Sequence, residues 1–147
     1  MALEGEYVPS PAKWVRDQVE AYERSGGKEA NTLLETGMPI IILTTRGAKS
    51  ATIRKIPLMR VEHAGEYALV ASVGGRPKNP VWVHNLWADP KAVTIQDGPE
   101  PWDADVREIT GEERATWWTR AVAAYPPYAE YQAKTERIIP VFIAAKR

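Results

Sequence analysis

The chain has 147 residues, of which 26% are charged and 44% are hydrophobic, and its nineteen basic and nineteen acidic side chains balance. This composition is typical of one globular domain spanning residues 1–147, and the balanced charge indicates neither a nucleic-acid nor a membrane partner. The absence of cysteine excludes disulfides, thiolate metal sites and a cysteine nucleophile. Residues 1–10 contain no apolar run, so we expect no signal peptide, no membrane span and a cytoplasmic protein.

The first predicted element is an amphipathic helix over Pro11–Ser25. Ser10 is a typical N-cap residue, and a proline in the first turn is compatible with helix geometry. An apolar stripe along one face could cover the protein's own core, join a partner or lie on a membrane surface, and core packing is the commonest of these roles. The stripe consists of Trp14, Val15, Val19 and Tyr22.

Three strands are predicted next along the chain. Residues 38–45 form a continuous β-branched run, which indicates a strand covered on both faces. Residues 54–62 predict a second strand, and Pro57 within it indicates a sheet edge or a bulge. A turn over residues 63–66 then leads into a returning strand over residues 67–72.

The second half of the chain alternates short helices and strands. A glycine-rich loop over residues 73–78 precedes a helix over residues 81–88, for which Asn79 is the expected cap. Strands follow over residues 92–96 and 102–109. Thr110 and Glu113 form a capping-box pattern for a helix that ends near Ala124. Residues 128–135 predict a short helix and residues 138–144 a last strand. The order predicts an α+β fold in which about six antiparallel strands close into a small barrel.

Few residues offer nucleophilic or metal chemistry. The two histidines, His63 in a hairpin turn and His84 on a helix, supply neither a catalytic triad nor a ligand set for zinc. We therefore expect no metal site.

Two basic loops are candidates for binding an anion. Lys49, Ser50 and Arg54 flank the first hairpin, and Arg76 and Lys78 flank a pair of glycines before a helix N-terminus. The spacing alone favours solvated turn residues over a phosphate site.

Three tyrosines are spaced three residues apart, at positions that share one face of a helix or turn. Tyr125, Tyr128 and Tyr131 could donate a proton or orient a carbonyl group, or they could form a packed cover over the barrel. The spacing leaves both interpretations open.

Taken in chain order, several motifs resemble the deazaflavin (F420)-dependent nitroreductase family, in its flavin/deazaflavin oxidoreductase A group. The resemblance covers nearly the whole chain after the first helix. The matching motifs are Leu43–Ser50 with Arg54–Leu58, Val70–Gly75 with Lys78–Trp82, Asn85-Leu86, Asp89-Pro90, Thr110–Arg114, and the segment from Tyr125 to Pro140 that includes Arg137.

The resemblance implies a split β-barrel, similar to the FMN-binding split barrels, that binds coenzyme F420 in a groove. It implies hydride transfer to a small-molecule substrate, namely an activated C=C bond, a quinone or a nitroaromatic ring. It further implies a monomer, and Tyr128, Tyr125 and Tyr131 as the substrate-side residues, with Tyr128 the foremost candidate proton donor. The implied cofactor residues are Lys49, Ser50, Arg54, Ile56, Pro57, Leu58, Ala71, Ser72, Val73, Gly74, Gly75, Asn79, Pro80, Val81, Trp82 and Asn85.

Two alternatives share this fold: an FMN-dependent reductase, and a non-catalytic module that binds deazaflavin. The tyrosine cluster favours an enzyme, because a carrier gains nothing from hydroxyls directed at a second ligand. The chain departs from the family pattern at Ala51, where glycine is usual, and at Ile56, Met59, Val73 and Val83.

Overall fold

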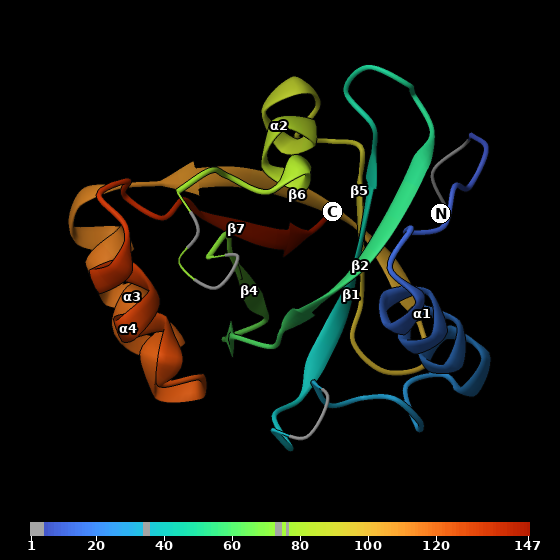
Figure 1. The fold of residues 1–147 in the computed structure, drawn as a ribbon, viewed down its shortest axis with the longest axis horizontal. Coiled ribbons are helices and arrows are strands. Elements are labelled where there is room, and N and C mark those ends of the chain that lie inside the picture. The colour runs from blue at the N-terminus through green and yellow to red at the C-terminus, as the bar shows by residue number, and fades with distance from the viewer. Residues whose placement is uncertain (1–4, 34–35, 73–74, 76) are drawn as a thin grey trace.

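A computed structural model describes residues 5–33, 36–72, 75 and 77–147. It contains seven strands and four helices within these ranges (Figure 1). The elements are α1 (Lys13–Ser25), β1 (Ile40–Arg46), β2 (Ile53–Met59), β3 (Glu62–His63), β4 (Glu66–Val70), α2 (Val81–Ala88), β5 (Val93–Gln96), β6 (Pro101–Ile109), α3 (Gly111–Ala124), α4 (Pro127–Lys134) and β7 (Val141–Lys146).

All strand pairs are antiparallel, and the sheet has the order β2-β1-β5-β6-β7-β4-β3. The predicted α+β split barrel is confirmed. Pro57 lies on β2, which is an edge strand, as its missing N–H group requires. The sheet curls until β2 and β4 come into contact, although they exchange no ladder of hydrogen bonds. The barrel is therefore split between these two strands.

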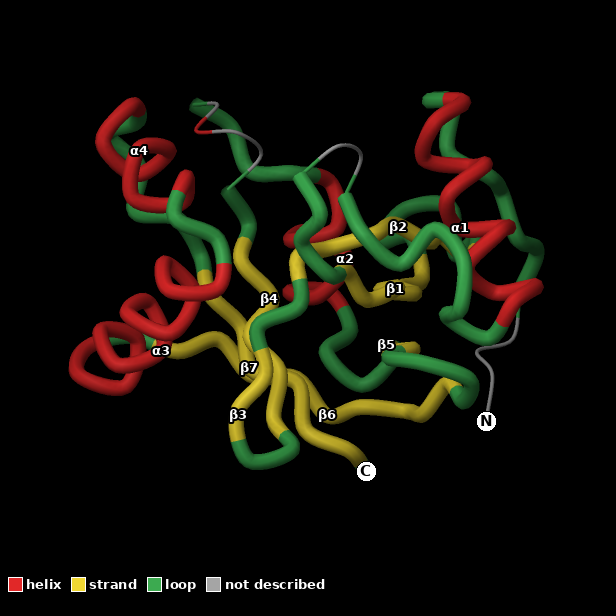
Figure 2. Tube along the Cα trace, turned by 90° about the horizontal axis from the view of Figure 1, so that it is seen from below, coloured by secondary structure: helices red, strands yellow, loops and turns green. Residues whose placement is uncertain are grey.

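Successive side chains point to opposite sides of a strand, and β1 is buried on both sides. On β1, Ile41 and Leu43 face the barrel interior, which α2 covers. Ile40 and Ile42 face outward into a second cluster that includes α1 and α3. Figure 2 shows α1 at one end of the molecule and α3 with α4 at the other. The prediction that the first strand is covered on both faces is confirmed, since residues 40–43 are at most 2% exposed.

Helix α1 packs its apolar stripe against the barrel. Val15, Val19 and Tyr22 are buried, so the core-packing role is confirmed for these three, whereas Trp14, the fourth residue of the stripe, is 48% exposed. The Tyr22 hydroxyl accepts a hydrogen bond of 2.7 Å from the Gly98 N–H and donates one of 3.4 Å to the Gln96 carbonyl, which fixes the helix to the β5–β6 turn. The helix begins at Lys13, two residues later than predicted.

The three predicted helix caps are wrong. Ser10 lies two residues before the N-cap of α1, which is Ala12, and its hydroxyl accepts a hydrogen bond of 3.2 Å from the Ala12 N–H. Thr110 makes no side-chain cap, and Glu113 instead binds the Arg107 guanidinium through two hydrogen bonds of 2.6 Å. This charged pair replaces the weaker contact of Glu113 with its own helix end. Asn79 does not cap α2 either, since its side-chain oxygen accepts a hydrogen bond from Arg137.

The strand predicted over residues 54–62 is divided. β2 ends at Met59 and the two-residue strand β3 begins at Glu62, which makes seven strands rather than six among the described residues. Arg60 lies at the break, where its N–H donates to the Pro39 carbonyl. Within the part of the chain that the structure describes, no helix is long and apolar enough to span a bilayer.

Candidate active site

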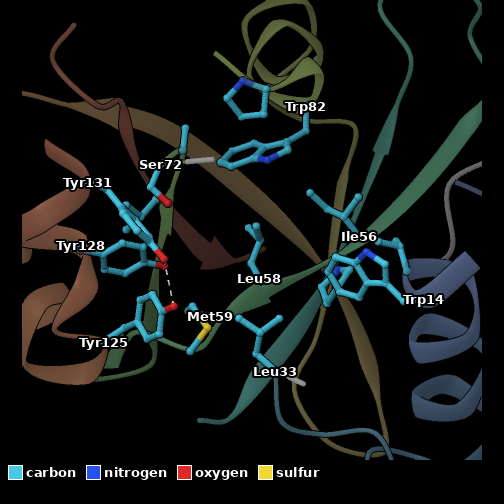
Figure 3. A pocket seen from close by; sticks show the side chains of 15 residues that line it. Trp14, Leu33, Ile56, Leu58, Met59, Ser72, Trp82, Tyr125, Tyr128 and Tyr131 are labelled. Carbon is cyan, nitrogen blue, oxygen red and sulfur yellow. Dashed lines mark hydrogen bonds between the residues drawn. The ribbon is translucent and has the colours of Figure 1, made fainter. Parts of the chain in front are cut away.

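A cavity of about 380 Å³ lies at the split of the barrel (Figure 3). One wall is the stretch Ile56–Met59 of β2, and the opposite wall is Val70–Ser72, where β4 ends. The start of α2 contributes Pro80 and Trp82. Three tyrosines close one side and Trp14 lies on the other, beside Val15 and Leu33. The cavity is therefore a largely apolar slot with hydroxyl groups along one side.

The three tyrosines form a compact cluster. Tyr125 ends α3, and Tyr128 and Tyr131 lie on α4, with ring centroids 5.0 to 6.3 Å apart. The hydroxyls of Tyr125 and Tyr131 are 3.2 Å apart and share a hydrogen bond. Tyr128 is only 3% exposed, and its hydroxyl makes no hydrogen bond to any residue that the structure describes. That hydroxyl is available to a ligand in the cavity.

Two of the phenols are held in the protonated form at neutral pH. The hydrogen bond to Tyr131, followed by burial, raises the pKa of Tyr125 to about 12. Burial, with smaller contributions from its two tyrosine neighbours, raises the pKa of Tyr128. These two residues therefore offer the cavity neutral hydroxyls, which can donate hydrogen bonds, rather than phenolates.

The basic residues of the first hairpin lie beyond the cavity, along β2. Arg54 shares one face of this strand with Ile56 and Leu58, which line the cavity, and two residues of a strand span about 7 Å. Lys49 and Ser50 are exposed in the β1–β2 turn. Arg54 therefore lies on the same face of β2 as the cavity wall, on the side nearer to the basic turn.

Asn85 anchors that turn to α2. Its buried side-chain oxygen accepts a hydrogen bond of 2.9 Å from the Ala48 N–H, and its amide donates one of 3.1 Å to the Thr45 hydroxyl. Since α2 also carries Trp82, the turn and the cavity are held in a fixed relation. Within the turn, the Ser50 hydroxyl lies 2.7 Å from the Thr52 hydroxyl.

Ten of the residues predicted for the site meet at the cavity, and the other predicted residues that the structure describes do not line it. Those that meet are Ile56, Pro57, Leu58, Ala71, Ser72, Pro80, Trp82, Tyr125, Tyr128 and Tyr131. Lys49 and Ser50 are exposed in the β1–β2 turn, Arg54 lies on β2, and Asn85 is buried and hydrogen-bonded to that turn. Val81 is 74% exposed at the start of α2. Val73, Gly74 and Arg76 lie outside the described residues.

Gly75 approaches protein rather than the cavity. Its φ is +81°, and a Cβ at this position would lie 2.8 Å from the Tyr131 carbonyl oxygen. The glycine lets the loop pack on α4. Sequence reasoning missed Trp14, Val15, Leu33 and Val70 as lining residues, because none of them carries a signal that separates it from an ordinary helix, connection or strand residue.

The fold and the site together define a class, that of split-barrel proteins with a ligand cavity at the opening between two strands. The family model described as F420H(2)-dependent quinone reductase matches residues 14–146. An F420H(2)-dependent quinone reductase of Mycobacterium tuberculosis is 32% identical over 112 residues, which cover 74% of each chain. A putative F420H(2)-dependent quinone reductase of the same species is 34% identical over 75% of this chain and 92% of its own.

Two solved structures are similar as well. An F420-H2 dependent reductase is 58% identical, with a TM-score of 0.68 over 72% of this chain and 93% of its own. A domain-swapped dimer is 52% identical, with a TM-score of 0.70 over 92% of this chain and 99% of its own. The chain belongs to the F420H(2)-dependent quinone reductase family. It is therefore an oxidoreductase with coenzyme F420 as its cofactor. This assignment speaks against the two alternatives, an FMN-dependent reductase and a non-catalytic module that binds deazaflavin.

Proposed function

We propose that the chain reduces a quinone with reduced coenzyme F420 in the cavity between β2 and β4. The observation that carries this proposal is an apolar slot of about 380 Å³, with the Tyr128 hydroxyl on one side and, on the other, the face of β2 that also carries Arg54. Slots of this kind suit a flat ring, with a few polar groups that fix its orientation. When bound, the cofactor supplies a hydride, that is, two electrons together.

The residues of the chain fit a long anionic cofactor with a flat ring. Ile56, Leu58 and Trp82 offer the apolar surfaces that would border the ring. Lys49 and Arg54 would bind the anionic tail through charge-assisted hydrogen bonds. The tether between Ala48 and Asn85 supports this assignment, because it keeps the basic turn at a fixed position relative to Trp82.

The tyrosines supply the proton side of the reaction. Reduction of a quinone to a hydroquinone adds one hydride and one proton, so a negative charge develops on a quinone oxygen as the hydride arrives. In this proposal the Tyr128 hydroxyl donates a hydrogen bond to that oxygen and stabilises the charge, and the proton that completes the hydroquinone passes to the oxygen from Tyr128, which regains a proton from water. A tyrosine is protonated at neutral pH, and burial raises the pKa of Tyr128 further from that range. An activated C=C bond or a nitroaromatic ring would use the same donor.

We further propose that the working unit is a monomer. One chain is enough to line both sides of the cavity, with Trp14 of α1 on one side and Tyr125, Tyr128 and Tyr131 on the other. Light scattering after size-exclusion chromatography should give the mass of one chain, and an active dimer that loses turnover on dilution would contradict this proposal.

The function is tested with purified protein, F420 and a soluble naphthoquinone. Titration with F420 and, separately, with FMN should show binding of F420 through quenching of tryptophan fluorescence, and the quinone should oxidise the reduced cofactor. Tyr128→Phe should lower turnover by about a hundredfold or more, the usual contribution of a proton donor. Its melting temperature should change little, because the hydroxyl makes no hydrogen bond to the described residues.

Tyr7→Phe is the matched control, because Tyr7 precedes α1, is 40% exposed and does not line the cavity. It removes the same hydroxyl group and should leave turnover unchanged. Failure of the wild-type protein to bind F420, or tighter binding of FMN, would refute the proposal for the site. Full activity of Tyr128→Phe would refute only the role of that hydroxyl.

A further inference from the structure

Arg137 lies in the connection between α4 and β7, outside the cavity lining, and its guanidinium reaches two separate segments of the cavity wall. One nitrogen, Nη2, donates hydrogen bonds to the carbonyl oxygens of Ala71 at 3.1 Å and Ser72 at 2.8 Å. The other, Nη1, donates to the Asn79 side-chain oxygen at 2.9 Å. A single side chain therefore connects the end of β4 with the residue before Pro80.

These contacts hold the two ends of one loop together. Ala71 and Ser72 precede the glycine-rich loop, and Asn79 follows it, so the guanidinium sets the separation between the β4 wall and the start of α2. The Ala71 N–H also donates to the Pro140 carbonyl at 3.0 Å, which continues the pairing of β4 with β7. Both segments are thus held against the same connection.

The same connection is bound to the helix that carries two of the tyrosines. Gln132 of α4 donates from its amide to the Arg137 carbonyl at 2.8 Å, and its side-chain oxygen accepts from the Ile139 N–H at 3.0 Å. Gln132 lies one residue after Tyr131. The position of the tyrosine side of the cavity is therefore coupled to the position of Ser72 and Pro80 through Arg137.

We infer that Arg137 is a positioning residue, which holds the Ala71–Ser72 wall and the start of α2 at the spacing from the tyrosines that hydride transfer requires. The inference rests on the proposed function, since it concerns the geometry of the same cavity. Arg137 touches none of the reacting groups, and it acts through the backbone of Ala71 and Ser72 and through Asn79.

The chemistry of the side chain explains why arginine serves here. The guanidinium is a rigid plane with five N–H donors in a fixed arrangement. Its two terminal nitrogens reach the carbonyl oxygens of Ala71 and Ser72 and the side-chain oxygen of Asn79. A lysine ammonium keeps the charge but is a single flexible point, so it cannot fix two segments at once. Arg137→Lys therefore removes the geometry and retains the charge.

The first measurement compares Arg137→Lys with the wild-type protein at saturating quinone and reduced F420. We expect the turnover number to fall by about tenfold to a hundredfold, the effect of a displacement near 1 Å, with a smaller change in the KM for quinone. Arg60→Lys is the control, because Arg60 is a half-buried arginine that binds Asp97 and does not line the cavity. It should lower the melting temperature without lowering turnover per folded molecule.

The second measurement is independent of activity. Amide hydrogen exchange of the ligand-free protein should become at least about tenfold faster at Gly75 and Val83, whose N–H groups donate to Ser72 and Pro80. Exchange at Leu43 in β1 should not change. Asn79→Ala removes one acceptor only, so it should show an intermediate loss of turnover even if Arg137→Lys folds poorly.

The outcomes separate the two proposals. Unchanged turnover and unchanged exchange in Arg137→Lys, with an active wild-type protein, would overturn the positioning role. An equal loss of turnover in Arg60→Lys would overturn it as well, because the loss would then reflect general destabilisation. If the wild-type protein fails to oxidise reduced F420, the proposed function fails, and the exchange rates at Gly75 and Val83 alone decide whether Arg137 holds the two segments.

Discussion

Replacing Ala51 by glycine should stabilise the protein. Ala51 has a φ of +57°, in the left-handed region, where a side chain costs about 1–2 kcal/mol. Glycine avoids this cost but loses about 0.4–1 kcal/mol through the greater freedom of the unfolded chain. The free energy of unfolding should therefore rise by about 1 kcal/mol, and the melting temperature by about 2–4 °C for a chain of this length. Urea unfolding and thermal melts followed by circular dichroism measure both quantities.

Ala48→Gly is the matched control within the same turn. The backbone of Ala48 does not lie in the left-handed region, so glycine should lower the free energy of unfolding by about 0.4–1 kcal/mol. Ala64→Gly in the hairpin between β3 and β4 should repeat the gain, because Ala64 has a φ of +53°. Changes of the same sign for Ala48→Gly and Ala51→Gly would refute the assignment of strain to the backbone of Ala51.

Two further predictions concern stability. Burial, followed by a hydrogen bond with Asp97, raises the pKa of Tyr67 to about 12. Folding therefore favours the neutral phenol. This stabilisation is complete below about pH 10, the pKa of a tyrosine in the unfolded chain, and is lost as the pH rises through about 12. In urea titrations Tyr67→Phe should flatten the loss of stability over that window, and a slope equal to that of the wild-type protein would contradict the pKa assignment. Tyr22→Phe should lower the free energy of unfolding by about 1–3 kcal/mol, because the Gly98 N–H loses its acceptor and the Gln96 carbonyl its donor. A change below about 0.5 kcal/mol in denaturant unfolding would show that water replaces the hydroxyl at little cost.

Local patterns in the sequence were sufficient to predict most of the fold. The β-branched run of β1, the alternation along β6 and the apolar stripe of α1 each have the period of the element that they form. Pro57 indicated an edge strand because it cannot donate to a ladder. Glycine is usual at position 51 in the family that the motifs resemble, which agrees with the positive φ of Ala51. Such signals lie within a few residues of one another, so they can be read without the tertiary structure.

Side-chain partners that are distant in the sequence depend on tertiary structure. Glu113 and Asn79 were predicted to cap helices, but each binds an arginine, because charge-assisted hydrogen bonds from a guanidinium are stronger than a cap contact. Arg137 meets Ala71 and Asn79 from positions 66 and 58 residues away.

The sequence by itself determined the elements, their order and the row of tyrosines. Only the tertiary structure decided that β2 and β4 approach without pairing and leave a cavity that Leu33 and Val70 help to line. The physical reason is that helix and strand periods are properties of the local backbone, whereas a cavity exists only where the packing of several distant elements leaves space unfilled.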